Sequence, residues 1–145
     1  KLSVFQYMIG NKDWFVTSRH NIIIMQTDDG DQNPYAIPYD FDFSGFVNAS
    51  YSYLPKETKS ALTSRRIFRG LCYTEDEFRQ VFKFYRALRP EFRAVIKKQE
   101  YLSQRSKRYV LNYIGQFYNI IGSRDLFEKE FLAHCETKRN YNIPE

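Results

Sequence analysis

Two carboxylates spaced two residues apart, Asp40 and Asp42, stand at the end of a strand-like run that begins at Tyr35. Successive side chains of a strand point to opposite faces, so residues two apart are expected on the same face. Two carboxylates that converge on one point suit a hard divalent cation such as Mg2+. The pair therefore predicts a metal site where this strand ends.

A second polar set precedes that pair and consists of Asn11, Asp13, His20 and Asn21. Phosphoryl transfer needs a divalent ion held by a carboxylate and often by an amide oxygen, and a second carboxylate that orients or deprotonates the attacking hydroxyl. In protein kinases the catalytic Asp and the metal-binding Asn share one loop, and the Asn follows after about five residues. Here Asn21 follows Asp13 by eight residues, and the acidic pair comes after an expected hairpin.

The longer loop and the residues around it resemble the spore-coat CotH-type family of atypical protein kinases. The matching positions, all within residues 11–45, are Asn11-x-Asp13, His20-Asn21-Ile22-Ile23-Ile24 and Pro38-Tyr39-Asp40-Phe41-Asp42-x-x-Gly45. This resemblance implies a kinase-like fold, Mg2+ (or Mn2+) and ATP as cofactors, and transfer of a phosphoryl group to a hydroxyl, with a protein as a possible substrate.

Carried over by position, the resemblance assigns Asp13 as the catalytic carboxylate. It assigns Asn21, Asp40 and Asp42 as metal ligands, with Asp40 or Asp42 as the principal one.

Two neighbours of these residues, Asn11 and His20, are expected to orient them, and His20 is more commonly a hydrogen-bonding residue than a base. Arg65 and Arg66 are weaker candidates for a contact with a phosphate or an acidic substrate. Ordinary surface or ion-pair roles are the more common use of such arginines.

A kinase also needs a lobe that covers the nucleotide and carries a Lys that pairs with its phosphates. Only twelve residues precede Asp13. We therefore expect the chain to be the C-terminal lobe of a longer protein, inactive as an isolated fragment. The missing N-terminal lobe would be its main partner, docked on an exposed apolar face. The alternative is a non-catalytic helical protein-interaction module that retains a degenerate kinase-like site.

The chain of 145 residues fits a single domain, 1–145, with a hairpin and site segment (1–55), a loop (56–73) and helices (74–137). Residues 1–55 hold three Lys/Arg and six Asp, whereas residues 56–145 hold 19 Lys/Arg and 11 acids. Because acids are interspersed among these cations, we favour solvated helix faces over a nucleic-acid footprint. No apolar run approaches the roughly 18 residues of a membrane span. Cys72 and Cys135 could be buried thiols or one disulfide.

The expected fold is α+β and mostly α-helical. The chain is expected to begin with a helix over residues 3–9 that Gly10 ends. A buried strand over 21–26, a hairpin loop over 27–34 and a return strand over 35–39 follow. A long loop covers 45–64, and a frayed tail covers 138–145. Four helices follow residue 74, with a capping box at Thr74, Pro90 opening the second and Ser103 starting the third. Ser123 caps the last helix.

Aromatic residues make up 18% of the chain, which predicts a core built largely from rings. A cluster of them near the expected site could be a stacking platform for a nucleobase or sugar, but core packing is the favoured interpretation. Its members are Tyr35, Tyr39, Phe41, Phe43, Phe46, Tyr51 and Tyr53.

Overall fold

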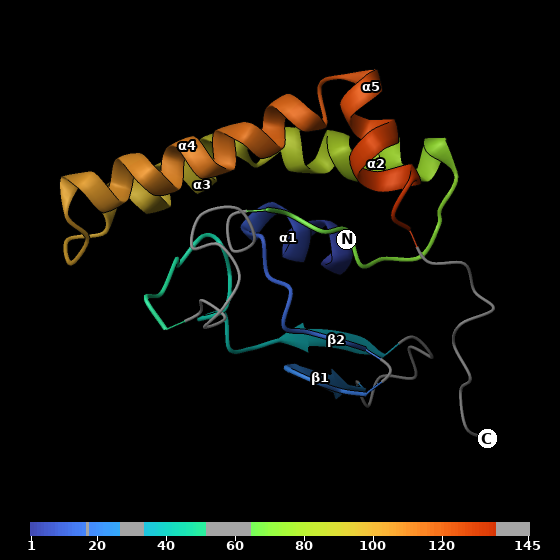
Figure 1. Cartoon of the computed structure of the whole chain (residues 1–145), viewed down its shortest axis with the longest axis horizontal. Helices are drawn as coiled ribbons and strands as arrows, with labels where there is room; N and C mark the ends of the chain where they lie inside the picture. The colour runs from blue at the N-terminus through green and yellow to red at the C-terminus, as the bar shows by residue number, and fades with distance from the viewer. Residues whose placement is uncertain (17, 27–33, 52–64, 136–145) are drawn as a thin grey trace.

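The structure is a computed structural model that describes residues 1–16, 18–26, 34–51 and 65–135. Within these ranges the chain forms five α-helices, one π-helical turn and one two-stranded antiparallel sheet. Figure 1 shows the helices that follow residue 74 on one side of α1 and the hairpin on the other. The expected α+β, mostly helical class is therefore confirmed.

The first helix, α1 (Leu2–Ile9), ends at Gly10, which has a φ of 67°. Such a left-handed residue commonly terminates a helix, and glycine adopts it without a steric penalty. A Cβ at this position would also lie 1.9 Å from the hydroxyl oxygen of Tyr113. The predicted stop at Gly10 is confirmed, and it directs the chain into the polar loop that carries Asp13.

The hairpin pairs β1 (Ile22–Met25) with β2 (Tyr35–Pro38), and Ile22 lies opposite Pro38. Both strands occur where the sequence predicts them, but the prediction that the first is buried is wrong. Ile22 is 2% exposed, whereas Ile23 is 56% exposed and Met25 is 46% exposed. The reason is that the hairpin packs little against the helices, so its outer side chains find no cover among the described residues. The predicted hairpin loop lies almost wholly in 27–33, outside those residues.

Local capping signals fix the helices of the second half. These are α2 (Glu75–Ala87), α3 (Arg89–Lys98), α4 (Gln104–Ile120) and α5 (Arg124–Phe127), the last continued by the π-helical turn η1 (Glu128–Leu132). Thr74 and Glu77 form the predicted capping box, in which the Thr74 hydroxyl accepts from the Glu77 amide. Ser103 caps α4 and Ser123 caps α5 in the same way. The four predicted helices are confirmed. The frayed tail predicted at 138–145 lies outside the described residues.

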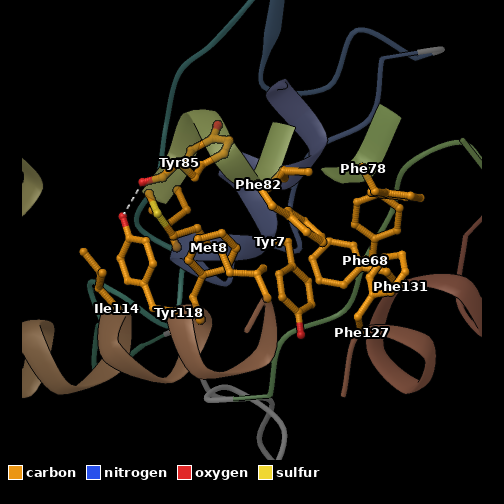
Figure 2. Close-up of a cluster of buried hydrophobic side chains, with 14 of the residues drawn as sticks. Tyr7, Met8, Phe68, Phe78, Phe82, Tyr85, Ile114, Tyr118, Phe127 and Phe131 are labelled. Carbon is orange, nitrogen blue, oxygen red and sulfur yellow. Dashed lines mark hydrogen bonds between the residues drawn. The ribbon is translucent and has the colours of Figure 1, made fainter. Parts of the chain in front are cut away.

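Rings from distant parts of the chain meet in one aromatic cluster, shown in Figure 2. Phe131 of η1 is fully buried and its ring centroid lies 4.5 Å from that of Tyr7 and 4.7 Å from that of Phe68. Burying one such side chain contributes about 1.5–3 kcal/mol. The cluster joins α1, the segment before α2, and the last helix into one body, as the aromatic content predicts.

The two cysteines form a disulfide bond, which decides the alternative that the sequence left open. Cys72 lies just before α2, and Cys135 follows η1, with Cα atoms 4.9 Å apart. The bond joins the segment before α2 to the residue range that follows η1, so it connects the two ends of the helical region. None of the described helices is both long and apolar enough to cross a membrane.

Candidate functional site

The loop between α1 and β1 is organised by Asn11 and Asp13. Asn11 is 1% exposed, and its Oδ1 accepts the backbone amide of Asp13 at 2.9 Å. Asn11 also forms a β-bridge with Ser44 of the loop that follows β2, so the two loops run side by side. Asn11 thereby holds the backbone of Asp13 and ties its loop to the loop that follows β2.

The carboxylate of Asp13 is contacted by both polar residues that close the loop. Nε2 of His20 lies 2.8 Å from Oδ1 of Asp13. Nδ2 of Asn21 donates to the backbone oxygen of Asp13 at 2.8 Å and to its Oδ2 at 3.2 Å. The Asp13 side chain remains 40% exposed, so it is held from one side and open to solvent on another.

The second acidic group lies at the base of the hairpin, next to Asn21. The backbone amide of Tyr39 donates to the oxygen of Asn21 at 3.1 Å, which places Asp40 beside the end of the first loop. A hydrogen bond shared with Asp42 raises the pKa of the exposed Asp40 carboxyl, and the negative charges of Asp42 and Asp13 add to this rise. Asp40 thus lies within electrostatic range of one carboxylate from each loop, Asp13 and Asp42.

Backbone strain is concentrated at the same place. Arg19, Asn21 and Asp40 have φ values of 52°, 52° and 55°, and only Asn48 joins them among described non-glycine residues. Residues other than glycine rarely adopt this region, and such outliers gather at functional sites. The strain therefore marks the base of the hairpin as a place whose geometry the rest of the fold maintains.

The acidic pair comes together for a reason other than the predicted one. Strand alternation was expected to point Asp40 and Asp42 the same way, but β2 ends at Pro38. Both aspartates lie beyond the strand, and the left-handed backbone at Asp40 turns the chain so that the two carboxyls meet. The contact is present, whereas the strand argument for it is wrong.

The two arginines that were weak candidates for a phosphate contact lie in different environments. Arg65 is exposed, but Arg66 is only 6% exposed. The guanidinium of Arg66 donates to the backbone oxygens of Met8 and Tyr113 and stacks on the Tyr113 ring at 3.8 Å. Core partners therefore occupy this side chain, so Arg66 is not available to a phosphate in this conformation.

Two further side chains, Tyr51 and Arg69, lie near the site. A hydrogen bond to Asp42 raises the pKa of the Tyr51 hydroxyl. The guanidinium of Arg69 lies 4.6 Å from the ring centre of Phe15, and its charge adds to the burial that lowers the pKa of Lys12. Lys12 adjoins Asp13 in sequence. Tyr51 was considered for stacking and Arg69 for a phosphate contact, whereas here Tyr51 contacts Asp42 and Arg69 contacts Phe15.

Most of the aromatic residues near the site lie outside the core. The core packing favoured from the sequence is therefore wrong for several of them. Tyr35, Tyr39, Phe43 and Tyr51 are between 42% and 65% exposed. Two others, Phe41 and Phe46, do pack partly against the core, as predicted. Tyr53 lies outside the described residues.

No cluster of three or more His, Cys, Asp or Glu side chains in the described ranges is arranged to hold a metal ion. Asp13 and Asp42 both affect the pKa of Asp40, but these carboxylates do not form a closed cage. No protein-family model matches the chain, and neither the curated proteins nor the solved structures contain a match to it.

Proposed function

We propose that this chain is the C-terminal lobe of a CotH-like atypical kinase that transfers a phosphoryl group from ATP to a hydroxyl. One observation carries the proposal: the Asn21 side-chain amide donates to Asp13, and Asp13 lies within electrostatic range of Asp40, which shares a hydrogen bond with Asp42. Residues distant in sequence thereby gather the groups that phosphoryl transfer requires, a catalytic carboxylate, an amide and metal-binding carboxylates.

Asp13 is the carboxylate that orients or deprotonates the acceptor hydroxyl. Its two contacts, from His20 and from the Asn21 amide nitrogen, fix the direction of its oxygens. A fixed carboxylate reaches the attacking proton without first paying for reorientation. The partly exposed side chain leaves room for an acceptor.

Mg2+ or Mn2+ would be held by Asp40, Asp42 and the amide oxygen of Asn21. A hydrogen bond with Asp42 is the main cause of the raised pKa of Asp40, and the negative charges of Asp42 and Asp13 add to it. A divalent cation between these carboxylates would offset that negative charge. Mg2+ in nucleotide sites takes one or two carboxylates and completes its shell with phosphate oxygens and water. A preformed cage of three acidic side chains is therefore not required.

An exposed apolar face on the hairpin supports the proposed N-terminal lobe as a partner. Ile23 lies opposite Ile37 and Met25 lies opposite Tyr35, so all four side chains share one face of the sheet. Each is between 39% and 56% exposed. Contiguous apolar surface of this kind typically marks a contact with another protein surface. The same observation favours the second candidate, a non-catalytic module that binds another protein.

Phosphotransfer by the full-length parent with Mg2+ or Mn2+ tests the proposal. Asp13→Ala should lower the rate about 10²- to 10⁴-fold, the usual contribution of a general base. Asp76→Ala is the matched control, because Asp76 is an exposed aspartate of α2 that pairs only locally with Arg79. Equal rates for the parent and Asp13→Ala would remove the kinase proposal.

The interaction module is distinguished by a second pair of measurements. Ile23→Asp, placed on the hairpin face, should disrupt partner binding under either candidate function. Only the kinase also predicts that Mn2+ broadens the NMR signals of Asp40 and Asp42, and that Asp42→Asn weakens this effect. Partner binding without any such broadening would favour the non-catalytic module.

A further inference from the structure

A groove of about 460 Å³ lies between the segment that follows the acidic pair and the start of α4. Phe46 and Val47 form one wall, and Leu102 and Tyr109 form the other. Arg105 is the charged residue of its lining. Val47 is 50% exposed and Leu102 is 37% exposed, so the groove offers apolar surface next to a cation.

Hydrogen bonds fix the groove relative to the site. The hydroxyl of Tyr109 donates to the backbone oxygen of Gly45 at 2.6 Å. The Gly45 amide in turn donates to the oxygen of Gly10 at 3.1 Å, just before the loop of Asp13. Phe46 follows Asp42 by four positions, a span of at most about 14 Å for an extended chain. A peptide lying in the groove is therefore within a few residues of the carboxylates.

The end of α3 and the start of α4, which lie beside the groove, are strongly basic. Residues 97–108 hold five Lys/Arg and one Glu, a net charge of +4. The ammonium of Lys107 donates to the backbone oxygen of Lys97 at 2.9 Å, which holds the end of α3 against the start of α4. Figure 1 shows these two helix ends side by side. The cations are thereby gathered at the same end of the molecule as the groove.

We infer that this groove binds the protein acceptor, and that the acceptor is an acidic segment with an apolar side chain near its hydroxyl residue. The apolar walls would take the apolar side chain, and Arg105 would pair with an acid residue of the bound segment. The surrounding positive field would mainly speed the encounter rather than set the affinity. This inference rests on the proposed kinase function in one respect: only a kinase would use the hydroxyl of the bound segment as a phosphoryl acceptor. The peptide-binding property itself does not depend on it.

Fluorescence anisotropy of a labelled peptide bound to the 145-residue chain tests the inference. The probe is a short peptide with one Ser among Glu and Leu residues, and its counterpart carries Lys in place of every Glu. The acidic probe should bind more tightly. Arg105→Glu should weaken its binding about tenfold, since charge reversal removes one exposed attraction and adds a repulsion of similar size.

Matched controls separate the groove from the general charge of the protein. Arg108→Glu makes the same charge change on α4 outside the groove lining, and Val95→Asp matches Val47→Asp on an exposed valine of α3. Val47→Asp should weaken the acidic probe, and both controls should stay within about twofold of the unmodified chain. Equal losses for Arg105→Glu and Arg108→Glu, or no preference for the acidic probe, would overturn the inference.

Asp13→Ala separates failure of the inference from failure of the kinase proposal, because Asp13 is not part of the groove lining. Peptide binding that survives Asp13→Ala supports the groove, whatever happens to phosphotransfer. If phosphotransfer depends on Asp13 but the acidic and basic probes bind equally well, the kinase proposal stands. The inference of an acidic acceptor is then refuted.

Discussion

Replacing Arg66 by Met decides whether this arginine serves the core or a ligand. The guanidinium is almost fully buried and donates to the backbone oxygens of Met8 and Tyr113 and to the side chain of Gln116. Burial lowers the pKa of Arg66, and the nearby tyrosines and Glu130 oppose that change. A methionine would fill most of the volume but would leave these acceptors without their donor.

The structure sets the size of the effect. Each buried carbonyl left without a donor costs about 1–3 kcal/mol, and a desolvated cation–π contact such as that on Tyr113 contributes about 2 kcal/mol. Removing the charge recovers several kcal/mol of its desolvation cost. We expect Arg66→Met to lower the free energy of unfolding by about 2–4 kcal/mol. Arg66→Lys should not restore it, because an ammonium cannot fork between two carbonyls while stacking on a ring.

Equilibrium unfolding in urea measures this change. Trp14, the single tryptophan, is 3% exposed and reports unfolding by its fluorescence. With an m-value of about 2 kcal/mol/M, the midpoint should fall by about 1–2 M urea. Arg65→Met, at the exposed neighbouring position, is the control and should change the free energy by less than about 0.5 kcal/mol. Equal midpoints for the two variants would refute the structural role assigned to Arg66.

Three further predictions concern the disulfide, a helix cap and the acidic pair. Cys72→Ser combined with Cys135→Ser should cost about 4 kcal/mol of unfolding free energy, because the bond closes a loop with a sequence separation of 63. Thr74→Ala should cost about 1 kcal/mol in the same assay, because it removes half of the capping box. Asp42→Asn should lower the pKa of Asp40 towards its ordinary value, as followed by carboxyl NMR titration, since Asp42 is the main cause of the rise. A raised pKa in the folded state means that Asp40 favours folding most at low pH. That contribution is lost as the pH rises from the ordinary aspartate pKa through the raised one.

Each of these predictions has a result that would contradict it. An unchanged urea midpoint in the double serine variant would mean that the bond does not form in solution. A Thr74→Ala variant as stable as the unmodified chain would remove the capping contribution. If the Asp40 titration is the same with Asp42→Asn, the two carboxyls do not share a hydrogen bond.

Features encoded by a few neighbouring residues were predictable from the sequence. Gly10 ends α1 because glycine alone adopts its backbone conformation cheaply, and Thr74 with Glu77 caps α2 through a contact spanning three residues. Ser103 and Ser123 act in the same local way. Such signals need no knowledge of what lies across the molecule.

Burial and long-range contacts were not predictable in the same way. The run Ile22–Met25 looks like a buried strand, because apolar content alone does not reveal whether anything covers it. The arrangement of Arg66 on Tyr113 and the pairing of Cys72 with Cys135 join residues far apart in sequence. At the site, the spacing of Asp40 and Asp42 predicted that the two carboxylates lie close together. The left-handed backbone at Asp40 that brings them together depends on the whole loop and was not predictable.

The end of α1 links the site to the aromatic cluster. The backbone oxygens of Ile9 and Gly10 accept the amides of Phe46 and Gly45, while Tyr7 on the same helix contacts Phe131. Any molecule that holds the two loops together therefore also holds α1 in its place against the core. Occupancy should then be visible as a rise in the melting temperature of the whole domain, growing with the logarithm of ligand concentration. A heat-denaturation screen of divalent cations and nucleotides would therefore detect ligand binding at the site without an enzymatic assay.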